Sequence, residues 1–268
     1  MPTRDPGRNR RSKRLGQHFL VDSEILRKIA DYAVLRRDEI VLEVGAGTGN
    51  LTAILEERVD KIIAVEKDPR LANFLREKFH GKKHVEIVEG DILKVPLPIF
   101  NKVVSSPPYY ISSRLIFLLL KKRLDSMTMT FQREFASRLV AEPGSPDYGR
   151  LTVALQHRAY VELLDFIPKT AFRPIPRVDS HIVKIVPRAQ VACADEAFLD
   201  RMIRYLFSQR KRTLRGVLNR AIDPNAKEPL ESLVEAAALL QKRIFQLTPS
   251  ELENLSDTLC RHQALFKF

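Results

Sequence analysis

The sequence predicts an α/β fold, in which a mostly parallel sheet is covered by helices and a smaller helical domain follows. Over the first two thirds of the 268 residues, short β-branched runs alternate with helical patterns. Such alternation is typical of parallel strands joined by helices that cover both faces of the sheet. After Pro187 the strand pattern stops, and from about Asp195 onward the pattern is helical.

Seven segments have the composition and length of strands, and helical patterns separate them. The expected strands are 40–44, 61–65, 85–88, 102–105, 126–131, 161–166 and 181–186. The helices expected between them include 23–35, 51–58, 70–79, 114–122 and 134–140. Only a proline-rich link separates the last two strands, so we expect an antiparallel pair to close the sheet.

The chain divides into three parts by composition. We expect a basic tail over 1–14, an α/β domain over 15–188 and a helical domain over 189–268. In the helical domain, Thr248-Pro249-Ser250-Glu251 is a capping box that begins the last helix. Leu252, Leu255 and Leu259 then form the buried stripe of that helix.

Positive charge is the strongest global signal. The net charge is +12, with six basic residues and one acid in 1–14 and seven basic residues and no acid in 201–220. Such clusters favour contact with a polyanion, and we expect Arg210, Lys211, Arg212 and Arg215 to bind RNA phosphates.

Cysteine usage and hydropathy narrow the class of protein. Cys193 and Cys260 are too few for a disulfide framework or a zinc site, which favours a reducing compartment and no metal. The longest apolar run, 115–120, is too short to span a bilayer. We expect a cytoplasmic protein without a membrane partner, although the Arg-rich N-terminus is also compatible with a mitochondrial transit peptide.

A glycine-rich turn follows the first predicted strand. Gly45, Gly47 and Gly49 have the spacing G-x-G-x-G, which differs from the G-x-G-x-x-G of dinucleotide sites. Glycine permits positive φ and a close approach of the backbone to a ligand. A turn of this kind is also common as a plain strand-to-helix connection. The assignment of a ligand site to this turn therefore needs support from other residues.

Two acids at neighbouring strand ends supply that support. Glu66 ends the second strand, 21 positions after Gly45, where it could accept hydroxyls of a ribose. Asp91 ends the third strand, where it could accept from an adenine amine. Acids would repel phosphate, and no phosphate-binding loop is present. The pattern therefore indicates an adenosine that carries a neutral or positive group, and S-adenosylmethionine fits.

The sequence VVSSPPYY ends the fourth strand at the same edge. Ser106-Pro107-Pro108-Tyr109 matches the (Asp/Asn/Ser)-Pro-Pro-aromatic pattern of enzymes that methylate exocyclic amines. The Ser106 oxygen and the Pro107 carbonyl could accept both N–H groups of such an amine and aim its lone pair at the methyl group. Tyr109 could stack on the unstacked base.

With these motifs, the chain resembles the small-subunit ribosomal RNA adenine dimethyltransferases of the KsgA type. The resemblance runs from Leu15 to about Leu218. The most specific matches are GQHFLVD (16–22), FRPIPRVDSHIVKI (172–185) and FSQRKRTLRGVL (207–218), beside LEVGAGTGNLT (42–52), VEKDPRL (65–71), GDIL (90–93), SPPYYISS (106–113) and FQREFASRLVAEPGSPDYGRLTV (131–153).

The resemblance implies a class I, Rossmann-like methyltransferase domain of seven strands and a small C-terminal helical domain. It implies transfer of two methyl groups to N6 of adjacent adenosines near the 3′ end of small-subunit rRNA, within a pre-ribosomal subunit, by a monomer. The cofactor contacts that it implies are His18, Leu20, Gly45, Gly47, Glu66, Asp91 and Ser106. It also implies that Phe172 stacks on the target base opposite Tyr109.

One motif departs from the family. Ser106-Pro107 stands where the family has Asn-Leu or Asn-Ile, which leaves open whether the second methyl group is added. Four alternatives stay open beside the dimethyltransferase: a 23S rRNA methyltransferase, a DNA adenine methyltransferase, a ribosome-assembly factor and a mitochondrial transcription factor. The last two would act mainly by binding.

Overall fold

The computed structural model describes residues 17–188, 195–224, 230, 234 and 237–268. The expected basic tail and Cys193 lie outside the described residues. The chain folds into two compact units, one of residues 1–136 and 161–187 and the other of 137–160 and 188–268.

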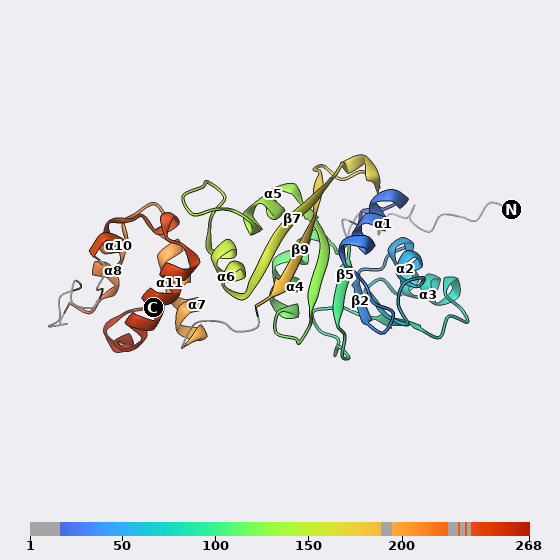
Figure 1. The fold of residues 1–268 in the computed structure, drawn as a ribbon, viewed down its shortest axis with the longest axis horizontal. Helices are drawn as coiled ribbons and strands as arrows, with labels where there is room; N and C mark the ends of the chain where they lie inside the picture. Colours follow the sequence, from blue (N-terminus) through green and yellow to red (C-terminus); the bar gives the residue numbers. More distant parts are fainter. Residues whose placement is uncertain (1–16, 189–194, 225–229, 231–233, 235–236) are drawn as a thin grey trace. The chain divides into compact units, whose positions relative to one another are not determined.

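The first unit contains a seven-stranded sheet in the order β4-β3-β2-β5-β6-β9-β7 (Figure 1). Its strands are β2 (Ile40–Val44), β3 (Lys61–Glu66), β4 (Val85–Glu89), β5 (Lys102–Ser105), β6 (Ser126–Gln132), β7 (Ala159–Ile167) and β9 (Ser180–Pro187). All seven lie where the alternation of the sequence predicts strands, and the predicted α/β class is confirmed.

Strand direction creates a crevice at one edge of this sheet. β2 runs parallel to both β3 and β5, and β3–β4 and β5–β6 are parallel pairs. β9 lies between β6 and β7 and runs antiparallel to β6. The chain moves outward from β2 in one direction and from β5 in the other. The carboxyl ends of β2 and β5 therefore flank the switch point, where open α/β sheets bind ligands.

Helices alternate with most of the strands along the chain, as the periodicity predicts. They are α1 (Ser23–Tyr32), α2 (Asn50–Leu55), α3 (Pro69–Lys78), α4 (Ser112–Leu119) and α5 (Arg133–Leu139), with short 3₁₀ turns η3 (Tyr109–Ile111) and η4 (Lys169–Ala171). Asp68 caps α3 by accepting from the Arg70 N–H, with Pro69 at the first helical position. Leu26 of α1, Leu55 of α2 and Leu75 of α3 join one core cluster with the sheet.

The alternation in the sequence did not predict two short strands. β1 (Phe19–Leu20) pairs antiparallel with β8 (Phe172–Arg173), with Leu20 opposite Phe172. Two residues are too few to show an alternating pattern, so only the folded chain reveals this pair. The pairing brings the GQHFL and FRPIP motifs side by side.

The second unit is helical. Its helices are α6 (Arg150–Arg158), α7 (Glu196–Phe207), α8 (Leu214–Ala221), α10 (Ala237–Gln241) and α11 (Pro249–Cys260), with 3₁₀ turns η5 (Ile244–Gln246) and η6 (Gln263–Leu265). The capping box of α11 is confirmed, since Thr248 and Glu251 exchange side-chain-to-backbone hydrogen bonds of 2.9 and 3.1 Å. None of the helices within the described residues is long and apolar enough to cross a membrane.

The helical unit also takes a segment from within the expected α/β domain. The sequence division at 188 places Ser137–Tyr160 with the sheet, whereas its packing places it with the helices. Tyr148 and Val153 are buried in the helical core cluster. The reason for the difference is that the chain leaves the sheet twice, after β6 and after β9, while the strand pattern ends only once, at Pro187.

Tyr148 ties that segment to the rest of the helical unit. Its side chain is fully buried, and its hydroxyl donates to the carbonyl of Leu247 over 2.6 Å. The ring also packs on Phe207, with 6.0 Å between centroids.

Tyr148→Phe should lower the free energy of unfolding by about 1–3 kcal/mol, because the buried Leu247 carbonyl loses its donor while the ring stays. Urea denaturation followed by circular dichroism measures the change. The matched control is Tyr160→Phe, since Tyr160 is 65% exposed. Equal effects in both variants would show that the Tyr148 hydrogen bond does not hold the segment.

Candidate functional site

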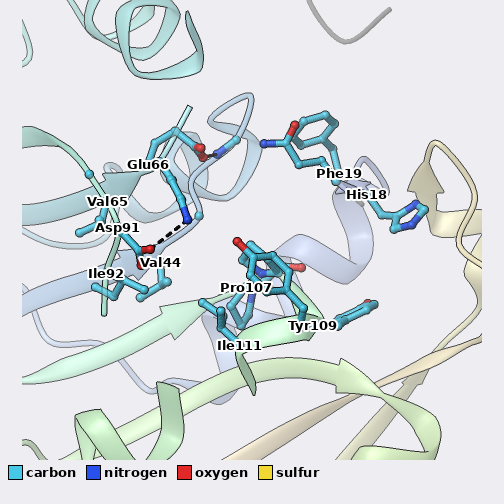
Figure 2. A pocket seen from close by; sticks show the side chains of 18 residues that line it. His18, Phe19, Val44, Val65, Glu66, Asp91, Ile92, Pro107, Tyr109 and Ile111 are labelled. Atoms are coloured by element: carbon cyan, nitrogen blue, oxygen red, sulfur yellow. Dashed lines mark hydrogen bonds and ion pairs between the residues drawn. The ribbon is translucent and has the colours of Figure 1, made fainter. Parts of the chain in front are cut away.

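A pocket with about 800 Å³ of open space lies at the carboxyl ends of the central strands. Residues that follow β2, β3, β4 and β5 line it, together with the segment 17–19. Figure 2 shows Glu66 and Asp91 on one side and His18 and Phe19 on the other, with Pro107, Tyr109 and Ile111 between them. This is the switch point of the sheet, where open α/β sheets bind ligands.

The glycine turn passes through a space that has no room for a side chain. Gly45 and Gly47 have φ of +72° and +58°. A Cβ on Gly45 would lie 2.9 Å from Pro108 Cδ, and one on Gly47 would lie 2.7 Å from Phe19 Cδ1. The turn therefore needs glycine for its conformation and for contact with both neighbours.

Glu66 lies at the end of β3 and is 4% exposed. Its Oε2 accepts from the Gly47 N–H over 2.9 Å, and its Oε1 accepts from the Asp68 N–H over 2.8 Å. Burial raises the pKa of this carboxyl, and the backbone N–H groups oppose the rise. A carboxylate has about four acceptor positions, so Glu66 can accept from a ligand as well as from these backbone N–H groups.

Asp91 is held from two sides. Its Oδ2 bonds Lys67 Nζ over 2.9 Å, and its Oδ1 accepts from the Leu93 N–H over 3.0 Å. The hydrogen bond from Lys67 lowers the pKa of Asp91, so the side chain is a carboxylate at neutral pH. Lys67 also lines the pocket.

A third acid lies under the glycine turn. Glu43 of β2 is buried, and its Oε2 accepts from the Thr52 hydroxyl over 2.7 Å. Burial raises its pKa to about 8, so at neutral pH this group is largely protonated. Its neutral form limits the repulsion that two ionised acids, Glu43 and Glu66, would create beneath a bound ligand.

The Ser106-Pro107-Pro108-Tyr109 corner forms the wall of the pocket beside the glycine turn. Ser106 Oγ lies 2.9 Å from Thr130 Oγ1 of β6, and Tyr109 Oη lies 2.6 Å from Ser180 Oγ of β9. Pro107 and Pro108 have no N–H, so these two positions add no backbone donor to the corner.

Phe172 lies elsewhere than expected. It does not line the pocket, is 1% exposed and belongs to the core, with its ring edge-on to Tyr109 at 6.5 Å between centroids. The β1–β8 pairing buries this ring, so no face of it is open to a base. In this structure Phe172 is therefore a core residue, whereas Tyr109 lines the pocket.

Two residues of the GQHFL motif lie at or beside the pocket. His18 lines the pocket, and its Nδ1 bonds the Pro174 carbonyl over 2.7 Å, which orients the ring. Leu20 is 5% exposed and borders a smaller neighbouring cavity that His18, Gly45 and Ser106 also line. Eight of the ten expected cofactor and catalytic residues thus meet in one pocket, and Leu20 lies just beside it.

The expected RNA-binding residues lie between α7 and α8 and on the first turn of α8. Lys211 and Arg212 are exposed. Arg210 is engaged within the protein, because it donates to the carbonyls of Ser145 and Pro146 and lies over the Phe245 ring. Arg210 therefore has a structural role that a count of basic residues does not show.

Several lining residues were not expected from the sequence. They include Lys67, Ile92 and the largely exposed Tyr110, and each of these three directly follows a residue that was singled out or stands within its motif. The sequence offered one signal for these residues, which is that they are adjacent to expected site residues. Only the folded strand ends show which of the adjacent residues line the pocket. In the part of the chain that the structure describes, no cluster of three or more His, Cys, Asp or Glu residues could hold a metal.

The sequence comparisons identify one family. The model of the ribosomal RNA adenine dimethylase family matches residues 8–256. A probable ribosomal RNA small subunit methyltransferase A from Methanosarcina barkeri is 42% identical over 246 residues, covering 90% of this chain and 85% of that protein. The corresponding protein of Methanopyrus kandleri is 42% identical over 253 residues, covering 91% and 90%.

Solved structures agree with the sequence relatives. A dimethyladenosine transferase from Plasmodium falciparum superposes with a TM-score of 0.82 at 27% identity, covering 93% of this chain and all of the other. The 23S rRNA methyltransferase ErmE superposes with a TM-score of 0.70 at 30% identity, covering 90% and 99%. From the match of the family model and these relatives, the chain belongs to the ribosomal RNA adenine dimethylase family.

Proposed function

We propose that this protein is an S-adenosylmethionine-dependent enzyme that dimethylates N6 of two adjacent adenosines near the 3′ end of small-subunit rRNA. One observation supports this most: the Ser106–Tyr109 corner lies in the same pocket as Gly45, Glu66 and Asp91. The residues expected to bind an exocyclic amine thus lie in the same pocket as the residues expected to bind an adenosine.

The residues present fit the cofactor. Gly45 and Gly47 line the pocket without side chains, and the buried Glu66 carboxylate lines it at the end of β3. Glu66 would accept from the ribose hydroxyls and Asp91 from the adenine amine, in the manner of nucleotide-binding sheets. His18 would close the opposite side. When bound, S-adenosylmethionine supplies an electrophilic methyl group.

The protein's part in the reaction is to prepare the amine. An adenine N6 is a weak nucleophile because its lone pair is delocalised into the ring. Ser106 Oγ and the Pro107 carbonyl would accept its two N–H bonds and aim the lone pair at the methyl group. These acceptors stand on a stiff corner, so little reorganisation accompanies the reaction. Tyr109 would stack against the flipped base.

The names of the relatives support small-subunit rRNA as the substrate. The curated relatives are named as ribosomal RNA small subunit methyltransferases and reach 42% identity, whereas ErmE, whose name specifies 23S rRNA, is 30% identical. We propose the small subunit during its assembly as the partner, with the protein acting as a cytoplasmic monomer. The complete set of cofactor-facing groups favours an enzyme over an assembly or transcription factor that acts by binding alone.

Glu66→Ala should weaken binding of S-adenosylmethionine by about 1–3 kcal/mol, because two ribose hydroxyls lose their acceptor inside the pocket. Isothermal calorimetry without RNA measures the change. Glu89→Ala is the matched control, since this acid ends the neighbouring strand β4, is exposed and does not line the pocket. Unchanged affinity of the Glu66 variant would remove Glu66 from the cofactor site.

Ser106→Ala should lower the single-turnover methylation rate on unmodified small subunits by about 10²–10³-fold, the effect of losing one preorganised partner. Affinity for cofactor and RNA should stay within a few fold. Ser106→Asn should retain activity, because an amide carbonyl replaces the hydroxyl as acceptor. Ser113→Ala, at an exposed serine on the first turn of α4, is the control. A fast Ser106→Ala enzyme would leave Ser106 as a turn residue only.

Neutralising Lys211 and Arg212 together should flatten the dependence of log Kobs on log salt by about 0.7–0.9 per lost phosphate contact. Filter binding to small-subunit rRNA between about 50 and 200 mM salt gives the slope. Lys121→Ala with Lys122→Ala removes the same charge from an exposed site after α4. If both double variants change the slope equally, the effect is one of net charge and the loop before α8 is no phosphate site.

A further inference from the structure

The loop 174–178, between β8 and β9, presents apolar side chains to solvent beside the pocket. Ile175 is 53% exposed and Val178 is 44% exposed. The carbonyl of Pro174, directly before Ile175, lies 2.7 Å from Nδ1 of His18, and His18 lines the pocket. One hydrogen bond therefore joins the exposed apolar loop to the wall of the candidate site.

Both ends of this loop are held to the sheet unit. Before the loop, β8 pairs with β1. After the loop, the Asp179 carboxylate accepts from the Lys169 N–H over 2.9 Å, and the Asp179 carbonyl accepts from the Arg133 N–H over 2.9 Å. Pro176, in the middle of the loop, is buried. Because prolines on both sides of Ile175 restrict the backbone between these fixed ends, the loop is stiff and keeps Ile175 exposed.

Two exposed arginines flank the apolar tip. Arg173 lies two positions before Ile175, and Arg177 lies two positions after it. Arg173 also donates to the carbonyls of Thr170 and Phe172, which orders the start of the loop. An apolar side chain between two cations is complementary to a nucleic acid, in which stacked bases lie between phosphates.

The proposed reaction creates a space in the RNA that suits such a tip. The target adenine must leave its stack to bring N6 to Ser106, and the loss of stacking opposes this step. Proteins that open base steps insert apolar side chains, isoleucine among them, between the bases. Tyr109 lies in the pocket, where it would hold the displaced base. The space left in the stack therefore needs a different occupant, outside the pocket.

We propose that Ile175 is a wedge, an apolar side chain that enters the base stack of the rRNA in place of the target adenine, while Arg177 binds an adjacent phosphate. The inference rests on the proposed methyl transfer and names the contact that keeps the target base out of its stack. Ile175 suits this role because it is exposed before RNA binds, is held by a stiff loop and is joined to the pocket through His18.

The first test measures unstacking without relying on methyl transfer. 2-Aminopurine, whose fluorescence rises when it leaves a stack, replaces one target adenosine in a fragment of small-subunit rRNA. The parent protein should raise the fluorescence. Ile175→Ala should lower the equilibrium constant of the unstacked complex by about 10–60-fold, because it removes apolar carbon atoms that each contribute about four-fold when buried. Ile175→Leu keeps the apolar volume and should act like the parent.

Ile99→Ala is the matched control. Ile99 is 85% exposed and also follows a proline, but it precedes β5 and so lies at the opposite edge of the sheet from Ser106. This change should alter neither the fluorescence nor the single-turnover methylation rate of unmodified small subunits, whereas Ile175→Ala should lower both. Calorimetry should show the same affinity for S-adenosylmethionine in all of these proteins, since neither isoleucine lines the pocket.

Arg177→Gln tests the phosphate contact separately. It should weaken binding of the rRNA fragment and flatten the dependence of log Kobs on log salt by about 0.7–0.9. Ile175→Ala should leave this slope unchanged, because an isoleucine releases no counterions from the RNA. An unchanged slope in the Arg177 variant would overturn the phosphate contact.

The outcomes also separate the inference from the function on which it rests. If Ile175→Ala slows methylation of small subunits and leaves the 2-aminopurine fluorescence unchanged, the tip contacts a protein of the subunit and the wedge is overturned. Equal effects of Ile175→Ala and Ile99→Ala, or a parent protein that raises no fluorescence, would overturn it as well. A parent that unstacks the base and transfers no methyl group to any rRNA would contradict the proposed function, while the fluorescence still decides the role of Ile175.

Discussion

The close contact between the glycine turn and the proline corner is the constraint on which the rest of the site depends. Gly45 passes so near to Pro108 that a Cβ would lie 2.9 Å from the proline ring, and Gly47 passes equally near to Phe19. These contacts bring the ends of β2 and β5 and the N-terminal GQHFL segment around one small volume. Because the turn meets both neighbours through its backbone, a methyl group added at either glycine would push the walls apart.

Burial and hydrogen bonding give three nearby acids different states. Glu43 is largely neutral at pH 7, since nothing positive compensates its burial fully. Glu66 is nearly as buried but accepts from the N–H groups of Gly47 and Asp68, which favour the ionised form. Asp91 is the most open and has Lys67 beside it. The pocket therefore offers ionised acceptors at the strand ends without stacking three charges together.

The two compact units divide the chemistry between them. The sheet unit holds the pocket and every residue that would meet cofactor or amine, while the exposed cations Lys211 and Arg212 belong to the helical unit. The segment Ser137–Tyr160, which joins the helical unit, carries Tyr148 and the carbonyls that bind Arg210. Within the helical unit, this segment therefore both fills the core and orders the loop before α8.

The sequence by itself determined the seven sheet strands, the edge where the pocket forms and most of its lining, because alternation and motif spacing are local properties. Gly45, Glu66, Asp91 and Ser106 each stand at the end of a predicted strand, and parallel strands bring such ends together. The β1–β8 pairing, the burial of Phe172, the engagement of Arg210 and the unit to which Ser137–Tyr160 belongs depend on contacts between distant segments. The same holds for Thr130, which looks like an ordinary strand residue until the proline corner places the Ser106 hydroxyl 2.9 Å from it. Tertiary structure alone decided these features, since the partners that define them are far away along the chain.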